Sequence, residues 1–156
     1  MHHDITLSKT KPEVVGTKTK DLMEVPPVVV SEETTIDEAA GTMWEGNIGS
    51  VIVVDKSGNM TGILTERDVL FSVTKSLTGK GVPVSSIMSK TSLKASPNEN
   101  IVTAVERMTK TGVRHLPVVD KNGKPVGMIS MRDAMSISEP LLKFVLKSVR
   151  KSRLSE

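Results

Sequence analysis

The amino-acid sequence predicts an α+β fold in which two pseudo-symmetric β-α-β-β-α repeats pack as one module, with a C-terminal helix added. The first reason is a duplication, because the motif Val-Val-Asp-Lys-x-Gly stands at 53–58 and again at 118–123, an offset of 65 residues. The second is the order of apolar patterns, which is the same in both copies. The third is length, since each copy is too short to bury an adequate core alone. Residue pairs related by this offset include Met23 and Met88, Ser31 and Ser96, Ala39 and Ala104, Met43 and Met108, and Gly62 and Gly127.

Each repeat is expected to begin with a strand and a capped helix. Val28 to Val30 is a short β-branched run, and Thr35 and Glu38 after it have the spacing of a capping box. Apolar residues then recur at the spacing of one helix face, and Gly46-Asn47 ends the pattern. The stripe is Ile36, Ala39, Ala40 and Met43 in the first copy, and Ile101, Ala104, Val105 and Met108, ending at Thr111-Gly112, in the second.

A hairpin and a second helix complete each repeat. Two strand-like runs flank a loop that contains glycine, a pattern typical of a β-hairpin. The strands are expected at Ser50 to Val54 and Met60 to Thr65, and at His115 to Val119 and Pro125 to Ser130. The second helices should run from Glu66 to about Ser76 and from Met131 to about Ser138.

These elements divide the chain into four parts. We predict a leader at 1–17, a first repeat at 18–80, a second repeat at 81–138, and a basic amphipathic C-terminal helix and tail at 139–156. The breaker-rich segment 77–83 joins the copies. The last helix has an apolar stripe and a basic face. It could pack within the protein or its dimer, which we favour, or on a partner helix or an acidic membrane surface.

Composition excludes several classes of protein. The chain of 156 residues is 37% hydrophobic and 25% charged, as in globular proteins, and no run is long enough to cross a bilayer. It has no cysteine, hence no disulfide and no zinc-thiolate site, and no secretory signal, so we expect a cytoplasmic protein without a metal centre. Glycine-rich nucleotide fingerprints are absent and only His115 lies inside the repeats, which argues against an enzyme.

The most suggestive chemistry lies where each hairpin meets the second helix. The first copy reads Thr65-Glu66-Arg67-Asp68 and the second Ser130-Met131-Arg132-Asp133. A hydroxyl three residues before an aspartate is a common helix cap. The same groups could hold a ligand, with the hydroxyl and the arginine on phosphate and the carboxylate accepting hydrogen bonds from ribose hydroxyls. Both interpretations can hold together.

At these residues the sequence resembles the tandem CBS domain pair, also called a Bateman module. The resemblance covers the chain from about Lys18 to Ile137 and rests on the Gly-x-hydrophobic-Thr/Ser-x-x-Asp signature, the repeated hairpin, and the run Val113-Arg114-His115-Leu116-Pro117. It implies clefts between the repeats that bind AMP, ADP or ATP, or S-adenosylmethionine, and a homodimer. By position, the resemblance implies that Asp68 and Asp133 bind the ribose. The residues implied to bind phosphate are Thr65, Ser130, Arg67, Arg132, Arg114 and His115. The residues implied to surround the base are Val28, Ile48, Gly49, Ser50, Leu93 and Val113.

The two predicted clefts differ in charge. Gly49 and Ser50 stand where the second copy has Arg114 and His115, so occupancy is expected to be unequal. His115 could reach a phosphate, or it could be a half-buried histidine that holds the start of a strand.

We therefore predict a non-catalytic module with no catalytic cofactor that senses an adenine nucleotide and signals to a separate protein. The segments outside the repeats are too short to form an attached enzyme or channel. One alternative is a nucleic-acid-associated protein, because the net charge is +3 and the basic residues gather in the leader and tail, although an aromatic content of 2% disfavours base stacking. Another is a dimerisation scaffold without a ligand.

Overall fold

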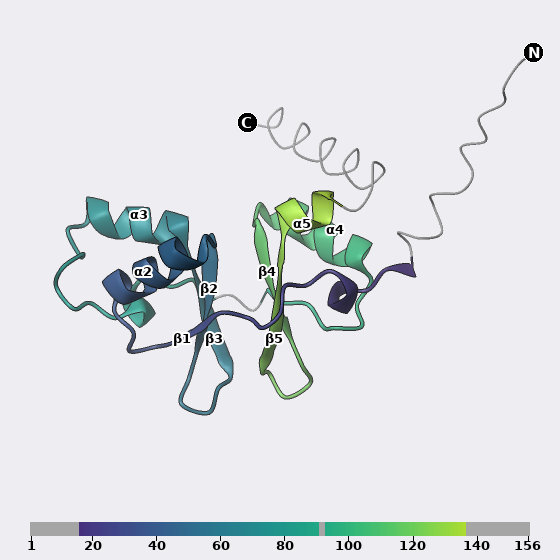
Figure 1. The fold of residues 1–156 in the computed structure, drawn as a ribbon, viewed down its shortest axis with the longest axis horizontal. Coiled ribbons are helices and arrows are strands. Elements are labelled where there is room, and N and C mark those ends of the chain that lie inside the picture. The colour runs from purple at the N-terminus through teal and green to yellow at the C-terminus, as the bar shows by residue number, and fades with distance from the viewer. Residues whose placement is uncertain (1–15, 91–92, 137–156) are drawn as a thin grey trace, which may run out of the picture.

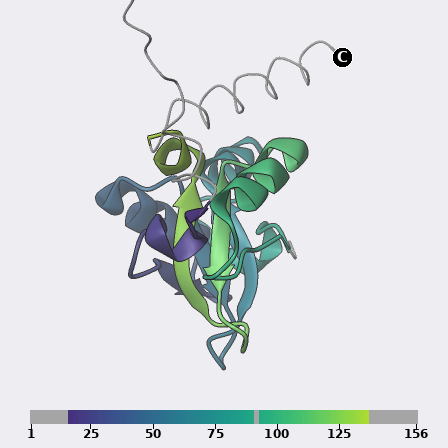
Figure 2. The ribbon, with the colours of Figure 1, turned by 90° about the vertical axis from the view of Figure 1, so that its right-hand side faces the viewer.

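The structure is a computed structural model that describes residues 16–90 and 93–136. The predicted C-terminal helix and most of the leader lie outside the described residues. Each repeat forms its own small sheet with helices packed on it, and the two sheets stand side by side (Figure 1). The hairpin turns lie at one end of the molecule and α3 and α5 at the other, as both views show (Figure 2).

The first repeat contains the full β-α-β-β-α order that the sequence predicts. Its three strands form one sheet in the order β1-β2-β3, with β1 parallel to β2 and β3 antiparallel to β2. The helices end within two residues of the expected positions. The elements are β1 (Val29–Ser31), α2 (Ile36–Gly46), β2 (Ser50–Val54), β3 (Met60–Thr65) and α3 (Glu66–Thr74).

The second repeat follows the same order with a shorter first strand. Its elements are α4 (Ile101–Thr111), β4 (His115–Val119), β5 (Pro125–Ser130) and α5 (Met131–Met135). The equivalent of β1 is a single parallel bridge between Ala95 and Val118, so its sheet has two strands. Pro97, which has no backbone N–H to donate, follows soon after the bridge. The α+β fold with two β-α-β-β-α repeats is confirmed.

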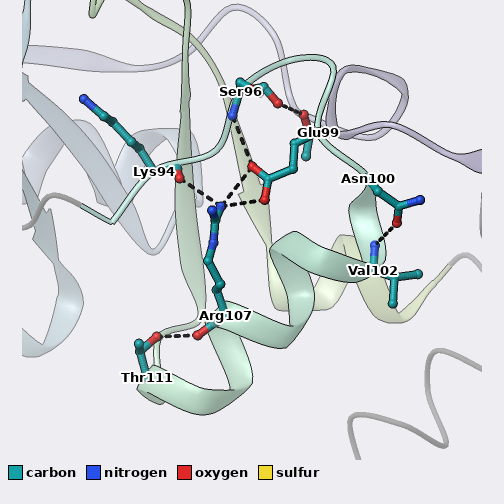
Figure 3. Close-up of polar contacts among 8 residues, drawn as sticks. Lys94, Ser96, Glu99, Asn100, Val102, Arg107 and Thr111 are labelled. Atoms are coloured by element: carbon teal, nitrogen blue, oxygen red, sulfur yellow. Dashed lines mark hydrogen bonds and ion pairs between the residues drawn. The ribbon is translucent and has the colours of Figure 1, made fainter.

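An arginine clamp replaces the missing strand pairing in the second repeat. The Arg107 guanidinium on α4 donates to the Lys94 carbonyl oxygen at 2.9 Å and pairs with the Glu99 carboxylate at 2.9 Å (Figure 3). Glu99 in turn accepts from the backbone N–H of Ser96 at 3.3 Å. Because a bond to a charged group is stronger than a neutral one, these contacts hold segment 94–99 against α4. The equivalent of Arg107 in the first repeat is Thr42.

Local signals fix the helix ends in both repeats. Thr35 and Glu38 form the predicted capping box, with the Glu38 N–H donating to Thr35 Oγ1 at 3.2 Å. Helix α4 uses Asn100 instead, which accepts from the Val102 N–H at 2.8 Å. Helices α2 and α4 each end on a left-handed residue, Asn47 at φ 49° and Gly112 at φ 70°.

The repeated aspartate of the hairpin motif has a structural role. Asp55 Oδ1 accepts from the backbone N–H groups of Ser57 at 2.8 Å and Asn59 at 3.0 Å. Asp120 Oδ1 makes the same pair of bonds, to the N–H groups of Asn122 and Lys124, at 2.8 and 3.0 Å. This Asx-type arrangement stabilises the turn, and it explains why the motif recurs unchanged.

The segments that precede the two repeats are exchanged between them. Residues 17–24, which include the short 3-10 helix η1 (Thr19–Asp21), run along the second repeat, where the Ile101 N–H donates to the Thr17 carbonyl oxygen at 3.0 Å (Figure 1). Residues 82–89, with η2 (Val84–Ser86), make the matching contacts to the first repeat, and the Ile36 N–H donates to the Val82 carbonyl at 2.9 Å. Each repeat is therefore completed by the segment that precedes the other repeat's first strand in the sequence.

The hydrophobic cores include the exchanged segments. Met88 and Val84 are buried with α2, β2 and β3 of the first repeat, while Leu22 and Met23 pack against the core of the second. A third cluster of Ile52, Ile63 and Met128 joins the two sheets. Gly62 and Gly127 permit the close approach, because a Cβ atom there would lie 2.7 Å from Met88 Sδ and 2.6 Å from Met23 Sδ respectively. The methionines thus act as adaptable core side chains.

Candidate functional site

A cleft of about 600 Å³ lies where the two repeats meet. Its walls come from both repeats and from the exchanged N-terminal segment, a volume and position typical of small-molecule sites. We call it the Asp133 cleft. Nine of the predicted site residues line it: Val28, Ile48, Gly49, Ser50, Arg114, His115, Ser130, Arg132 and Asp133.

The other predicted site residues do not line this cleft. Each of them is related by the 65-residue offset to a residue that lines the Asp133 cleft. The repeat therefore assigns these residues to the second expected cleft, which remains a prediction. The residues outside the Asp133 cleft are Thr65, Arg67, Asp68, Leu93 and Val113.

The hydroxyl and carboxylate pair is a helix cap in both repeats. Thr65 Oγ1 accepts from the Asp68 N–H at 3.4 Å and donates to Asp68 Oδ2 at 3.0 Å. Ser130 Oγ accepts from the Asp133 N–H at 3.1 Å and donates to Asp133 Oδ2. A carboxylate can accept about four hydrogen bonds, so capping leaves capacity for ribose hydroxyls. The structural and functional interpretations are therefore compatible at both sites.

The start of each middle strand is tied to the helix that follows the hairpin. The Glu66 N–H donates to the Gly49 carbonyl at 3.1 Å, and the Met131 N–H donates to the Arg114 carbonyl at 2.7 Å. These equivalent bonds hold Gly49 and Arg114 next to the residues that cap α3 and α5. The cleft floor is thus built from backbone that secondary structure fixes.

His115 lies across the repeat boundary from Gly49. A Cβ atom at Gly49 would stand 3.0 Å from His115 Cε1, so the small residue in one repeat accommodates the large residue in the other. Burial lowers the pKa of His115, an effect that the nearby Arg114 and Arg132 add to and that Glu66 and Asp133 oppose. The imidazole is therefore neutral near pH 7 and can either accept or donate a hydrogen bond.

Glu24 is a cleft residue that the sequence analysis missed. It lines the cleft beside Asp133, and its pKa is raised by partial burial and by the charge of, and a side-chain hydrogen bond with, Asp133, while Arg132 opposes the rise. The repeat comparison contained a signal for it, because the equivalent residue is Ser89 and an acid replaces a hydroxyl. Among the described residues, no group of three histidine, cysteine or acidic side chains is placed to hold a metal ion.

The fold and the cleft agree with comparisons to known proteins. The family model of the CBS domain matches residues 20–75 and again 84–139. This chain therefore belongs to the CBS domain family and carries a tandem CBS domain pair. In the part of the chain that the structure describes, no helix has the length and apolar character needed to span a membrane.

Similar proteins include two that are matched over most of their length. The chain is 35% identical to the CBS domain-containing protein YhcV of Bacillus subtilis, over 73% of this chain and 80% of that protein. It is 34% identical to an uncharacterised 17.7 kDa protein of Acidianus ambivalens, over 76% of this chain and 71% of that protein. A match to inosine-5'-monophosphate dehydrogenase of Aquifex aeolicus, at 33% identity, covers 85% of this chain but only 27% of the enzyme.

Two solved structures with the same fold hold adenosine compounds. A CBS domain protein from Pyrobaculum aerophilum, complexed with AMP, has a TM-score of 0.74 at 26% identity and covers 84% of this chain and 99% of its own. A CBS domain pair in complex with 5'-methylthioadenosine and S-adenosyl-L-methionine has a TM-score of 0.73 at 26% identity, over 78% of this chain and 94% of that chain.

Proposed function

We propose that this protein is a non-catalytic cytoplasmic regulatory module that binds an adenosine-containing ligand, AMP, ADP, ATP or S-adenosylmethionine, between its two repeats. The observation that carries the proposal is the Asp133 cleft, which brings nine separately predicted residues together at the repeat boundary. The adenosine compounds held by two structures of the same fold support it. The partial matches to enzymes give no support for catalysis, because they cover about a quarter of each enzyme.

Each part of the ligand has a matching group in the cleft. Asp133 accepts hydrogen bonds from the ribose hydroxyls. The apolar side chains of Val28 and Ile48 flank the base, beside the backbone of Gly49 and Ser50. Phosphates or other 5' groups would contact the remaining polar side chains, of which the two arginines carry guanidinium forks that suit phosphate oxygens. These side chains are Ser130, Arg132, Arg114 and His115. The equivalent set in the second cleft is Asp68 with Thr65, Arg67, Leu93 and Val113.

Ligand binding can be transmitted because the cleft walls belong to different repeats. Val28 and Ile48 come from the first repeat, whereas Ser130 and Asp133 come from the second. A ligand that contacts both stabilises the relative orientation for which it has the higher affinity. The signal then reaches a separate protein through the change in orientation, which is a coupling between two sites.

We further propose a homodimer formed through the helices of the first repeat. Large apolar side chains are exposed there, and Trp44 on α2 is 87% accessible and Leu70 on α3 65%. Phe71 and Val73 on α3 are exposed as well. The residues equivalent to Trp44 and Leu70 in the second repeat are Thr109 and the partly buried Met135, and among the described helices only those of the first repeat expose large apolar side chains. A Trp44→Ser, Leu70→Ser variant should be shifted toward the monomer, as measured by sedimentation. A sedimentation mass equal to that of the wild-type protein would overturn this interface.

Titration calorimetry with AMP, ADP, ATP and S-adenosylmethionine tests the ligand. We expect Asp133→Ala to weaken binding at one cleft by about 10- to 100-fold, because hydrogen bonds to a charged group contribute about 1.5–3 kcal/mol. Asp68→Ala should act on the other cleft, so that the two variants report each site separately. Thermal unfolding of both variants controls for the lost cap, which costs roughly 1 kcal/mol. Absence of saturable binding by the wild-type protein would overturn the proposed function.

Titration with nucleic acid at several salt concentrations, and the stability of the aspartate variants, distinguish the two alternative functions. If the protein binds nucleic acid, its affinity for nucleic acid should fall steeply as salt is added. That affinity should not change in the Asp68→Ala and Asp133→Ala variants. A scaffold without a ligand shows only the stability cost of the caps in both aspartate variants.

A further inference from the structure

The backbone holds Glu24 at the rim of the Asp133 cleft. Its N–H donates to the Met128 carbonyl at 2.9 Å, and the Met128 N–H donates to the Glu24 carbonyl at 3.2 Å. Because Met128 lies on β5, this residue of the exchanged N-terminal segment is fixed to the sheet of the second repeat. Its side chain is exposed and lines the cleft together with Asp133.

The Glu24 carboxyl changes the charge of the cleft. The ionisable groups that line it are the carboxyls of Glu24, Glu66 and Asp133 and the guanidiniums of Arg114 and Arg132, together with the neutral imidazole of His115. With all carboxyls ionised, negative groups outnumber positive ones. Glu24 thus adds a negative charge to the cleft whose two arginines would attract a 5' phosphate.

The pseudo-symmetric position offers a natural control. Ser89 makes the same backbone pair with Ile63, in which the Ser89 N–H and the Ile63 N–H each donate to the other residue's carbonyl at 3.0 Å. The two positions share their backbone geometry and differ in side chain. Replacing the glutamate with serine therefore reproduces a residue that the same fold already carries at the equivalent place.

We propose that Glu24 determines the charge of the ligand in the Asp133 cleft, favouring an adenosine compound with a neutral or cationic 5' group over one with phosphates. The inference rests on the proposed function and assigns the substituent that this cleft prefers. The physical reason is Coulombic: a carboxylate beside the ribose site repels phosphates, attracts a sulfonium or ammonium group, and leaves an uncharged thioether almost unaffected. The pKa of Glu24 is raised first by burial and then by the charge of Asp133, as expected for two carboxyls that line the same cleft.

The test is titration calorimetry of the Asp68→Ala protein, which isolates the Asp133 cleft, with AMP, 5'-methylthioadenosine and S-adenosylmethionine. We expect Glu24→Gln and Glu24→Ser to raise the affinity for AMP by about 3- to 10-fold, to change that for 5'-methylthioadenosine less than about twofold, and to lower that for S-adenosylmethionine. The gain for AMP should shrink as salt is added. Glu45→Gln, which removes the same charge from the exposed surface of α2 outside the cleft, is the matched control and should leave all three affinities unchanged.

The outcomes separate the two proposals. If the Asp68→Ala protein binds the ligands but their relative affinities are the same in the Glu24 variants, or change equally in Glu45→Gln, the role of Glu24 is overturned and the adenosine site stands. If neither this protein nor the wild type binds any of the three compounds saturably, the proposed function is overturned, and the role of Glu24 with it.

Discussion

The two repeats reach the same fold by partly different interactions. In the first, β1 pairs with β2 over three residues and a capping box begins α2. In the second, one bridge at Ala95 and the Arg107 clamp do the work of the strand, and Asn100 alone caps α4. What the repeats share is the hairpin, its Asp-stabilised turn and the buried helix stripe. The fold therefore depends on those shared features, while the outer segments and the cleft residues are free to differ.

The cleft residues also differ between the repeats, in size and in charge. Gly49 makes room for His115 across the boundary, and Glu24 occupies the position that Ser89 holds on the other side. A larger residue at position 49, as in the second repeat, would crowd His115. A serine at position 24, as at the equivalent Ser89, would remove a charge. The asymmetry between the repeats is thus a property of their shared interface.

The largest expected effect tests whether the repeats are independent. Ile36→Ala and Ile101→Ala each remove a fully buried side chain at the start of equivalent helices, and each should cost about 2–5 kcal/mol. Each core contains residues of an exchanged segment, so neither repeat has a complete core of its own. Both variants should therefore shift one common unfolding transition. Urea unfolding followed by circular dichroism and by hydrogen exchange measures this. Two separate transitions, with each variant moving only one, would contradict the coupling.

A smaller effect is expected from the arginine clamp. Arg107→Ala should destabilise the protein by about 1–2 kcal/mol, because it removes a charge-assisted bond and leaves the mostly buried Glu99 carboxylate without its partner. Thr42→Ala, the equivalent change in the first repeat, should stay within about 0.5 kcal/mol. Hydrogen exchange should be faster around residues 94–99 only in the arginine variant. Equal effects of the two changes would remove this difference between the repeats.

The smallest effect concerns pH. The ordinary pKa of histidine is about 6.5, and that of His115 is lowered in the folded protein. Below about pH 6.5 the unfolded chain takes up a proton on this imidazole before the folded chain does, so folding stability falls until the pH passes the lowered pKa. His115→Gln should make the loss of thermal stability between about pH 7 and 5 shallower. An identical pH profile would show that the imidazole is not protected from protonation.

Sequence alone was sufficient for the family and for the helices and hairpins of the two repeats. The hairpins, the helix stripes and the caps at Thr35, Thr65 and Ser130 depend on residues a few positions apart, so their spacing is visible in the printed chain. The 65-residue offset added the repeat, and the sequence comparison placed both copies in the CBS domain family. The predicted domain boundaries and individual ligand roles remain predictions.

Only the tertiary structure decided how the repeats meet. The exchange of residues 17–24 and 82–89, the single bridge at Ala95, and the meeting of Glu24 with Asp133 all join residues that are distant in the chain. Such contacts leave no periodicity, because they depend on the packing of two completed sheets. The sequence thus identifies the residue types that are available for a ligand site. Which of them share one cleft, and with what net charge, follows from the way the two halves pack.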